Sequence, residues 1–365
     1  MKGNKIPSTI SLCSGCEACA NACPKDAISM KPDWRGFLYP KVDNSKCINC
    51  GLCQKACPTN SLPIKPYEFT EAFAFVDANA EMFYRASSGG AFGRLAQYIF
   101  EQQGVAYGCT MDSNYDVYFT RATNIEELRS MHGSKYVQAR INDSFRQIKQ
   151  DLKTGKKVLF GACPCQVAGL KHFLGGDHEN LITMDLICHG VPSHSYFKAY
   201  VTKLLKEKPE FDRFAFRHKM REGDDEKVYA GWGHQPTDYY NQLFLWGKTY
   251  RGSCYKCPYA GGARQGDFTI GDFHTGDYIT KQKYNVSGCS VVYVNTPKGK
   301  ELKYIFKENS LFQELKSQEE AMGKDGGQMK HPSHNDLRTP LVYLAFKVFG
   351  IKGPETIFRI LHGKK

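Results

Sequence analysis

Beyond about residue 70, short apolar segments alternate with amphipathic segments along the chain. Two apolar segments, 105–111 and 116–122, are joined by a polar turn and predict paired strands. Residues 144–154, which end before Gly155, favour a helix. Residues 91–103 predict an amphipathic helix with a serine cap, because Ser-Ser-Gly-Gly at 87–90 precedes them. This region is therefore expected to be an α/β domain.

One stretch of this region has the order strand, turn, helix, strand. The strands are 157–160 and 181–187, and the helix covers residues 166–173. Strands joined in this way are parallel neighbours or near-neighbours. Cys165 and Cys188 then follow the carboxyl ends of two parallel strands, at the edge where open α/β sheets bind ligands. We expect a mixed sheet containing a βαβ unit, with a site at that edge.

The composition of the 365 residues is that of a globular protein with two domains, or one large domain and a small module. Hydrophobic residues make up 41% and charged residues 24%, which excludes a disordered or collagen-like chain. Mean hydropathy is −0.47. No segment approaches the roughly 18–20 apolar residues of a membrane span, and the N-terminus does not resemble a secretory signal. We therefore expect a cytoplasmic protein without a membrane span.

Fifteen cysteines are the most informative feature of the composition. Eight of them form two runs with the pattern C-x2-C-x2-C-x3-C-P, and the second run repeats the first 34 residues later. The first run is Cys13, Cys16, Cys19 and Cys23, and the second is Cys47, Cys50, Cys53 and Cys57. In a reducing compartment, thiols at this density indicate metal binding rather than disulfides.

The spacing within each run is that of a bacterial two-cluster 4Fe-4S ferredoxin, which residues 8–65 resemble. In this arrangement three cysteines of a run bind one cluster and the fourth binds the other. The predicted ligands are therefore Cys13, Cys16, Cys19 and Cys57 for one cluster, and Cys47, Cys50, Cys53 and Cys23 for the other. We expect the fourth cysteine of each run to open a short helix. Zinc knuckles are the alternative, but they do not require the eightfold pattern.

Four further cysteines could bind a third 4Fe-4S cluster. They are Cys165, Cys188, Cys254 and Cys257, the last two in a C-x2-C pair. A zinc site and unligated thiols are the alternatives, because ligands so distant in sequence do not identify the metal. Cys163 could replace Cys165 as a ligand. Cys109 and Cys289 are expected to be ordinary core cysteines.

The formal net charge of +12 does not indicate nucleic-acid binding. Two or three oxidised clusters, each carrying about −2 with its thiolates, would offset roughly 4–6 charges. The remaining basic residues are dispersed and form no aromatic-interleaved stripe. An acidic protein carrier or a phosphorylated cofactor fits this charge better than DNA or RNA.

A series of motifs outside the cysteine runs carries a family resemblance. The motifs are SSGGAF at 87–92, GSKYVQ at 133–138, PCQVAGLK at 164–171, CHGVPS at 188–193, CYKC at 254–257 and DFTIGDF at 267–273. Residues 70–295 resemble the beta subunit of coenzyme F420 hydrogenase and dehydrogenase, in the form fused to an N-terminal two-cluster ferredoxin. The sequence departs from the family pattern at Ala162-Cys163 and at His274, which leaves the identity of the substrate pocket open.

The resemblance implies an iron–sulfur flavoprotein with FAD or FMN. Its flavin site would be lined by Ser87, Ser88, Gly89, Gly90, Lys135, Tyr136 and Gln138. The family also retains cysteines that match Cys165, Cys188, Cys254 and Cys257, in support of a third cluster. No acid–base pair can be identified, so the catalytic residues are unknown.

Three regions are expected along the chain. Residues 1–66 form an α+β ferredoxin-like dicluster module, bounded by Pro58, Pro63 and Pro66. Residues 67–325 form the α/β flavin and iron–sulfur domain, and residues 326–365 a tail with a short helix at 341–349.

The function expected from these parts is an oxidoreductase that relays electrons between ferredoxin or another redox protein and a small-molecule hydride donor or acceptor. That molecule would be deazaflavin-like or an intermediate of cell-surface polysaccharide synthesis. The alternative is a non-catalytic electron-transfer subunit of a larger complex.

Overall fold

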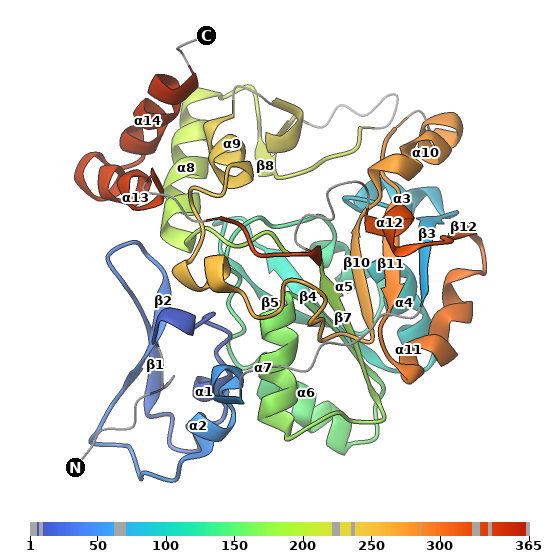
Figure 1. Cartoon of the computed structure of the whole chain (residues 1–365), viewed down its shortest axis with the longest axis horizontal. Coiled ribbons are helices and arrows are strands. Elements are labelled where there is room, and N and C mark those ends of the chain that lie inside the picture. The colour runs from blue at the N-terminus through green and yellow to red at the C-terminus, as the bar shows by residue number, and fades with distance from the viewer. Residues whose placement is uncertain are drawn as a thin grey trace.

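A computed structural model describes residues 6, 10–61, 71–220, 227–234, 238–284, 286–322, 329–334 and 338–362. A small N-terminal module lies against one flank of a larger α/β domain, next to helix α7 (Figure 1). The predicted boundary prolines Pro63 and Pro66 lie outside the described residues.

The N-terminal module consists of a two-stranded sheet and two one-turn helices. Strand β1 (Ile28–Pro32) pairs antiparallel with β2 (Leu38–Val42). Helix α1 (Ala18–Asn21) contains Cys19, and α2 (Leu52–Lys55) contains Cys53. The expectation that the fourth cysteine of each run opens a short helix is wrong for Cys23, because helix α1 precedes it and no helix begins directly after it. After Cys57, though not after Cys23, a 3-10 turn follows (η2, Pro58–Ser61).

An eight-stranded mixed sheet with the order β12-β3-β11-β10-β7-β6-β4-β5 forms the centre of the large domain. Its strands are β3 (Glu71–Asp77), β4 (Val105–Met111), β5 (Val117–Ala122), β6 (Val158–Ala162), β7 (Leu181–Leu186), β10 (Phe268–Asp272), β11 (Ser290–Val294) and β12 (Ser310–Glu314). Strands β4, β6, β7 and β10 run parallel, and the remaining pairings are antiparallel. The predicted hairpin β4–β5 and the predicted parallel pair β6–β7 are both confirmed.

Helices cover both faces of this sheet because alternate residues of its buried strands are apolar on either side. Helix α4 (Ala91–Glu101) packs on one face, where Leu95 and Leu159 belong to one core. Helices α6 (Ser144–Lys153) and α7 (Pro164–Leu174) pack on the other, where Phe145 and Phe160 are fully buried. The shorter helices of this domain are α3 (Ala80–Arg85), α5 (Ile125–Leu128), α10 (Asp277–Tyr284), α11 (Pro297–Leu302) and α12 (Gln318–Met322).

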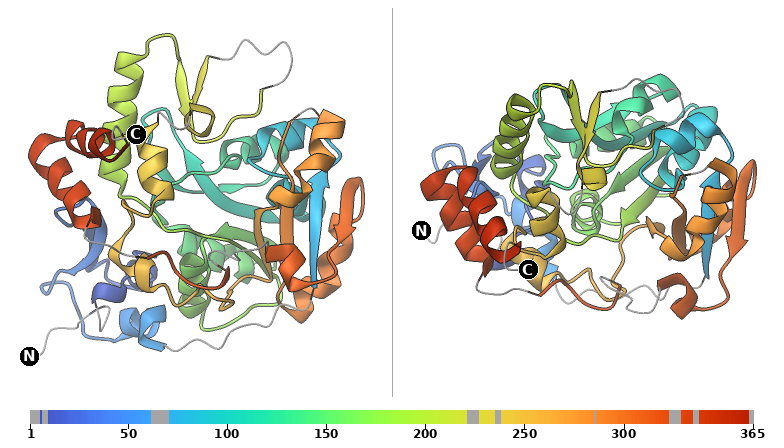
Figure 2. Two further views of the ribbon diagram at one scale, coloured as in Figure 1. Left: turned by 45° about the horizontal axis from the view of Figure 1, so that its top comes forward. Right: turned by 90° about the horizontal axis from the view of Figure 1, so that it is seen from above.

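An aromatic-rich subdomain lies at the end of the molecule away from β12 (Figure 2). It comprises α8 (His194–Glu207), β8 (Arg213–Ala215), β9 (Val228–Ala230), α9 (Tyr239–Leu245), α13 (Arg338–Phe349) and α14 (Lys352–His362). The helix predicted at 341–349 is α13, and α14 was not predicted. Both helices bury side chains in this core, including Tyr343 and Phe358. Within the described residues, no helix has the length and apolarity to cross a membrane.

Candidate functional site

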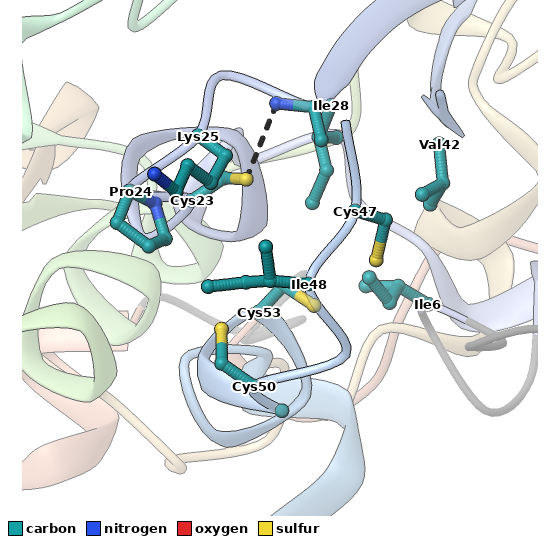
Figure 3. Close-up of a pocket in the computed structure, with 12 residues that line it drawn as sticks. Ile6, Cys23, Pro24, Lys25, Ile28, Val42, Cys47, Ile48, Cys50 and Cys53 are labelled. Atoms are coloured by element: carbon teal, nitrogen blue, oxygen red, sulfur yellow. Dashed lines mark hydrogen bonds between the residues drawn. The ribbon is translucent and has the colours of Figure 1, made fainter. Parts of the chain in front are cut away.

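The eight N-terminal cysteines gather around two small cavities. One cavity is lined by Cys13, Cys16, Cys19 and Cys57, here called the first cysteine group. The other is lined by Cys23, Cys47, Cys50 and Cys53, the second cysteine group (Figure 3). Each run thus contributes three cysteines to one group and its fourth to the other, in the partition that the sequence predicts. The assignment of these thiols as ligands stays a prediction.

All four thiols of the first group are buried, at most 9% exposed, whereas in the second group Cys53 is buried (8% exposed), Cys23 and Cys47 are half-buried and Cys50 is exposed. Burial, and to a smaller extent the neighbouring thiols Cys13 and Cys57, raise the pKa of Cys16 to about 12. Thiols so close together in a buried place fit a metal cluster, because bound iron supplies the positive charge that thiolates need there.

A buried arginine joins the first cysteine group to the large domain. The Arg251 guanidinium is fully buried and donates hydrogen bonds to the carbonyl oxygens of Cys13 (2.6 Å) and Leu38 (2.9 Å). It also donates to Gln138 Oε1 (3.0 Å) and to the sulfur of Cys13 (3.6 Å). Gln138 Nε2 in turn donates to the carbonyl of Ser14 (3.3 Å). A full positive charge therefore lies beside the first group, a role that no sequence motif indicated.

A third cysteine group, Cys165, Cys188, Cys254 and Cys257, is assembled at the carboxyl edge of β6 and β7. Each of the last three thiols raises the pKa of Cys165, and Cys188 and Cys257 raise that of Cys254, so the four lie close together. Burial is the larger cause and raises the pKa of Cys254 to about 12 and that of Cys257 to about 11. Cys254 lies in the turn η5 (Gly252–Lys256).

A fifth thiol, that of Cys163, lies beside the third cysteine group. Cys163 is the N-cap of α7, and its side chain is hydrogen-bonded to Cys188, which lowers the pKa of Cys188. The choice between Cys163 and Cys165 as a ligand therefore stays open. Within the described part of the chain, no three His, Cys, Asp or Glu side chains are close enough to hold a single metal ion. A 4Fe-4S cluster differs from a single ion in that its cysteine thiolates bind separate irons.

The first and third cysteine groups are neighbours. Gly169 of α7 lies against α1, where an added Cβ would fall 3.0 Å from the Cys16 sulfur. Cys16 also raises the pKa of Cys165 across this contact. The ring of Tyr259 is buried beside both groups, and Cys165, Cys16, Cys257 and Cys57 all raise its pKa, after the larger effect of burial. A Cβ at position 169 would therefore crowd the Cys16 side chain and push α7 and α1 apart by a few tenths of an ångström.

A cavity of about 580 Å³ adjoins the third group, and Ser14 of the first cysteine run also lines it. Six of the seven residues predicted to line a flavin site line it, namely Ser87, Ser88, Gly90, Lys135, Tyr136 and Gln138. Gly89 is not among the lining residues. Its amide donates to Ser290 Oγ (2.8 Å), and an added Cβ would collide with the carbonyl of Phe75. Cys163, Cys165 and Cys188 line the same cavity, which brings the third group to its wall.

The side-chain polar atoms of these residues bond mainly to protein groups. Lys135 Nζ donates to the carbonyls of Met131 (3.0 Å) and His132 (2.7 Å), and burial lowers its pKa to about 8. Ser87 Oγ accepts from the Ser134 amide (2.6 Å), and Ser88 Oγ donates to the Cys289 carbonyl (2.7 Å). They therefore shape the cavity wall and hold its loops together.

The start of α4 differs from the expected serine cap. Its N-cap is Gly90, with a left-handed φ of 93° and no side-chain hydrogen bond to the first turn. The predicted serine cap is therefore wrong. Ala91, Phe92 and Gly93 of the first turn line the cavity, so this helix begins at the cavity wall.

Aromatic side chains and one ion pair form the remaining wall. Tyr136 stacks on Trp232, with ring centroids 5.3 Å apart, and Phe244 adjoins Tyr136. Arg217 pairs with Asp272 at 2.7 Å. Trp232 and Arg217 were missed at the sequence level because neither belongs to a recognisable motif. Of the two expected core cysteines, Cys289 is buried, whereas Cys109 lines the cavity.

Two family models match the chain. The 4Fe-4S dicluster domain matches residues 12–61, and the C terminus of the coenzyme F420 hydrogenase/dehydrogenase beta subunit matches residues 155–319. The chain joins an iron–sulfur dicluster domain to a domain of this beta-subunit family. The dicluster domain contains both cysteine runs, and the beta-subunit domain contains all of the third group. The predicted cavity residues 87–90 and 135–138 lie outside both matched regions.

One solved structure similar to this chain is a xenon derivative of the F420-reducing [NiFe] hydrogenase complex from Methanosarcina barkeri. The sequences are 15% identical, the match covers 81% of this chain and 94% of the other, and the TM-score is 0.49. No curated protein sequence matches the chain. The dicluster domain is typical of a protein that carries two 4Fe-4S clusters.

Proposed function

We propose that this protein is an iron–sulfur flavoprotein oxidoreductase that converts single-electron transfer into hydride exchange with an organic substrate. The observation that supports it is the succession of the second cysteine group, the first group, the third group and the cavity. The first group contacts the third through α1 and α7, and the third lines the cavity. Three 4Fe-4S clusters, one in each group, would form an unbroken path.

A flavin is the cofactor that fits the cavity's position at the end of this path. When bound, it exchanges single electrons with clusters and hydride with organic molecules. Tyr136 and Trp232 offer flat apolar contacts for its ring system. The uncapped first turn of α4 offers backbone N–H groups for a phosphate. Arg217, held by Asp272, supplies a fixed positive charge on the same wall.

The residues of the chain have distinct tasks in this proposal. The three cysteine groups hold the clusters, with Cys163 as an alternative to Cys165. Gln138 links the cavity to the first cysteine group through Arg251. The substrate would be a deazaflavin-like coenzyme or an intermediate of cell-surface polysaccharide synthesis. A ferredoxin-type protein would deliver or remove the electrons, in the cytoplasm.

The second candidate is a non-catalytic electron-transfer subunit. Its support is the family itself, whose matching model describes a subunit of hydrogenases and dehydrogenases. Anaerobically purified protein distinguishes the two. About twelve irons and one flavin per chain support the oxidoreductase, whereas about eight irons without flavin support the carrier.

The relay is tested by Cys254→Ala, with Cys289→Ala as the matched control because that thiol is buried outside all three groups. We expect Cys254→Ala to lower iron from about twelve to about eight per chain. It should also abolish reduction of the flavin by reduced ferredoxin while the two N-terminal clusters remain reducible. The control should retain both iron and flavin reduction. Flavin reduction that persists in Cys254→Ala overturns the proposed path.

A further inference from the structure

We propose that the surface around Cys50 is the docking site for an acidic one-electron carrier protein, and that electrons enter through the second cysteine group. This inference rests on the proposed function and names where its protein partner binds. The docking surface is defined by Ile48, Cys50 and Leu52 with the surrounding lysines Lys25, Lys41, Lys46 and Lys55.

The second cysteine group is the one that a partner can reach. Cys50 is exposed, whereas every thiol of the first group is at most 9% exposed. The third group belongs to the large domain, where it adjoins the first group at the contact of α7 with α1 and lines the cavity. A protein that exchanges electrons with this chain at the dicluster domain therefore approaches the second group.

Two large apolar side chains flank the exposed thiol. Ile48 is 57% exposed and Leu52 is 46% exposed. Ile48 lines the same cavity as Cys50, and Lys25 lies at its rim (Figure 3). An apolar centre with a charged rim is the usual arrangement of a protein interface, and electron-transfer encounters use small ones.

The charge around this centre identifies the partner as acidic. Lys25, Lys41, Lys46 and Lys55 are exposed, and no salt bridge to any of them is found among the described residues. Of the nearby carboxylates, Asp26 is paired with Arg146 (2.7 Å) and Glu17 is buried beside Arg140. Within residues 10–61, Asp33 is paired with Arg35 (3.0 Å), and Asp43, close to Lys46, is the carboxylate without an arginine partner. The net charge of four lysines and one aspartate outweighs the charge of an oxidised cluster with its thiolates, which is about −2. The surface is therefore positive.

Such a charge pattern acts mainly on the rate of association. Opposite charges steer two proteins together and raise the association rate about 10–1,000-fold at low salt. The test variant is therefore K25E/K46E/K55E. Its matched control is K153E/K206E/K316E, which changes net charge equally at exposed lysines on α6, on α8 and after β12.

The experiment mixes oxidised holoprotein with a reduced acidic ferredoxin in an anaerobic stopped-flow instrument and follows cluster bleaching at low salt. We expect the second-order rate of the docking variant to be at least about tenfold below that of the control. The fall of the rate with rising salt should disappear or reverse in the docking variant, whose surface is now negative, and should remain in the control. Dithionite should bleach both to the same extent, which establishes that their clusters are intact.

Equal rates in the two variants overturn the docking site. If the triple variant does not retain its clusters, Lys46→Glu alone is compared with Lys206→Glu. The second-order rate of Lys46→Glu is then expected to be the lower of the two, by a smaller factor. If ferredoxin bleaches the wild-type clusters but the flavin is not reduced, the proposed function is overturned and the docking site stands. If dithionite reduces the wild-type clusters and flavin but reduced ferredoxin does not, the docking site is overturned and the proposed function stands.

Discussion

The two cysteine runs have the same spacing and the same local backbone, but opposite surroundings. Gly15 (φ 70°) and its counterpart Asn49 (φ 55°) are both left-handed. Glu17 (φ 58°) and its counterpart Gly51 (φ 75°) are left-handed as well. The loop that wraps a cluster is thus built twice from different residues, because the cysteine spacing and the left-handed turns determine its path.

The two runs differ in the protein groups that pack against each loop. Glu17 is 4% exposed and lies 3.7 Å from Arg140 of the large domain, whereas a Cβ at Gly51 would contact nothing. A Cβ at Gly15 would overlap the amide of Gln138, whereas the side chain of Asn49 is exposed to solvent. Local sequence therefore forms both loops. Packing against the large domain then determines which cysteine group is covered and lies between the other two.

The strongest test of this comparison uses the two glycines. Alanine in a left-handed conformation costs about 1 kcal/mol at either position. At Gly15 it also displaces Gln138 from its hydrogen bond with Arg251, for about 2 kcal/mol more. We expect Gly15→Ala to lower the thermal midpoint of the holoprotein clearly more than Gly51→Ala, as measured by loss of cluster absorbance. Equal midpoints would contradict tight docking of the first run.

Arg251 offers a test with an electrochemical result. Its buried positive charge and its hydrogen bond to the Cys13 sulfur favour the reduced, more negative cluster. We expect Arg251→Met to lower the reduction potential of the first-group cluster by on the order of 100 mV, from one charge at close range with an effective dielectric constant of about 20. Potentials are measured by redox titration with EPR.

The second-group cluster serves as the internal control, since Arg251 bonds to the first group. Arg251→Lys keeps the charge and should recover part of the shift. A shift of equal size in both clusters would show that Arg251 acts on the whole module and not through Cys13.

The smallest expected effect concerns removal of iron. Ferricyanide with a chelator should attack the second-group cluster first, because Cys50 is exposed and the first group is buried. We expect about four irons to leave several-fold faster than the other four of the dicluster domain. Iron release is followed by absorbance, with EPR identifying the remaining cluster. Simultaneous loss of both clusters would contradict the difference in protection.

Much of the fold was predictable because its signals are local. The hairpin β4–β5 and the unit β6–α7–β7 follow from apolar segments separated by polar turns. The serine cap before α4 was wrong because Gly90 takes the left-handed cap position, while Ser87 and Ser88 bond to distant residues. Hydrogen bonds of that kind depend on loops that meet only in the folded domain.

The sequence by itself determined how the N-terminal cysteines are grouped, since each loop brings three of them together within a few residues. Only the tertiary structure decided which group is buried and how it meets the third. The third group joins residues from the end of β7, the start of α7 and the turn η5, and the cavity adds Trp232 and Arg217. Contacts between segments so far apart in the chain depend on how helices and strands pack, and spacing along the sequence carries no record of that packing.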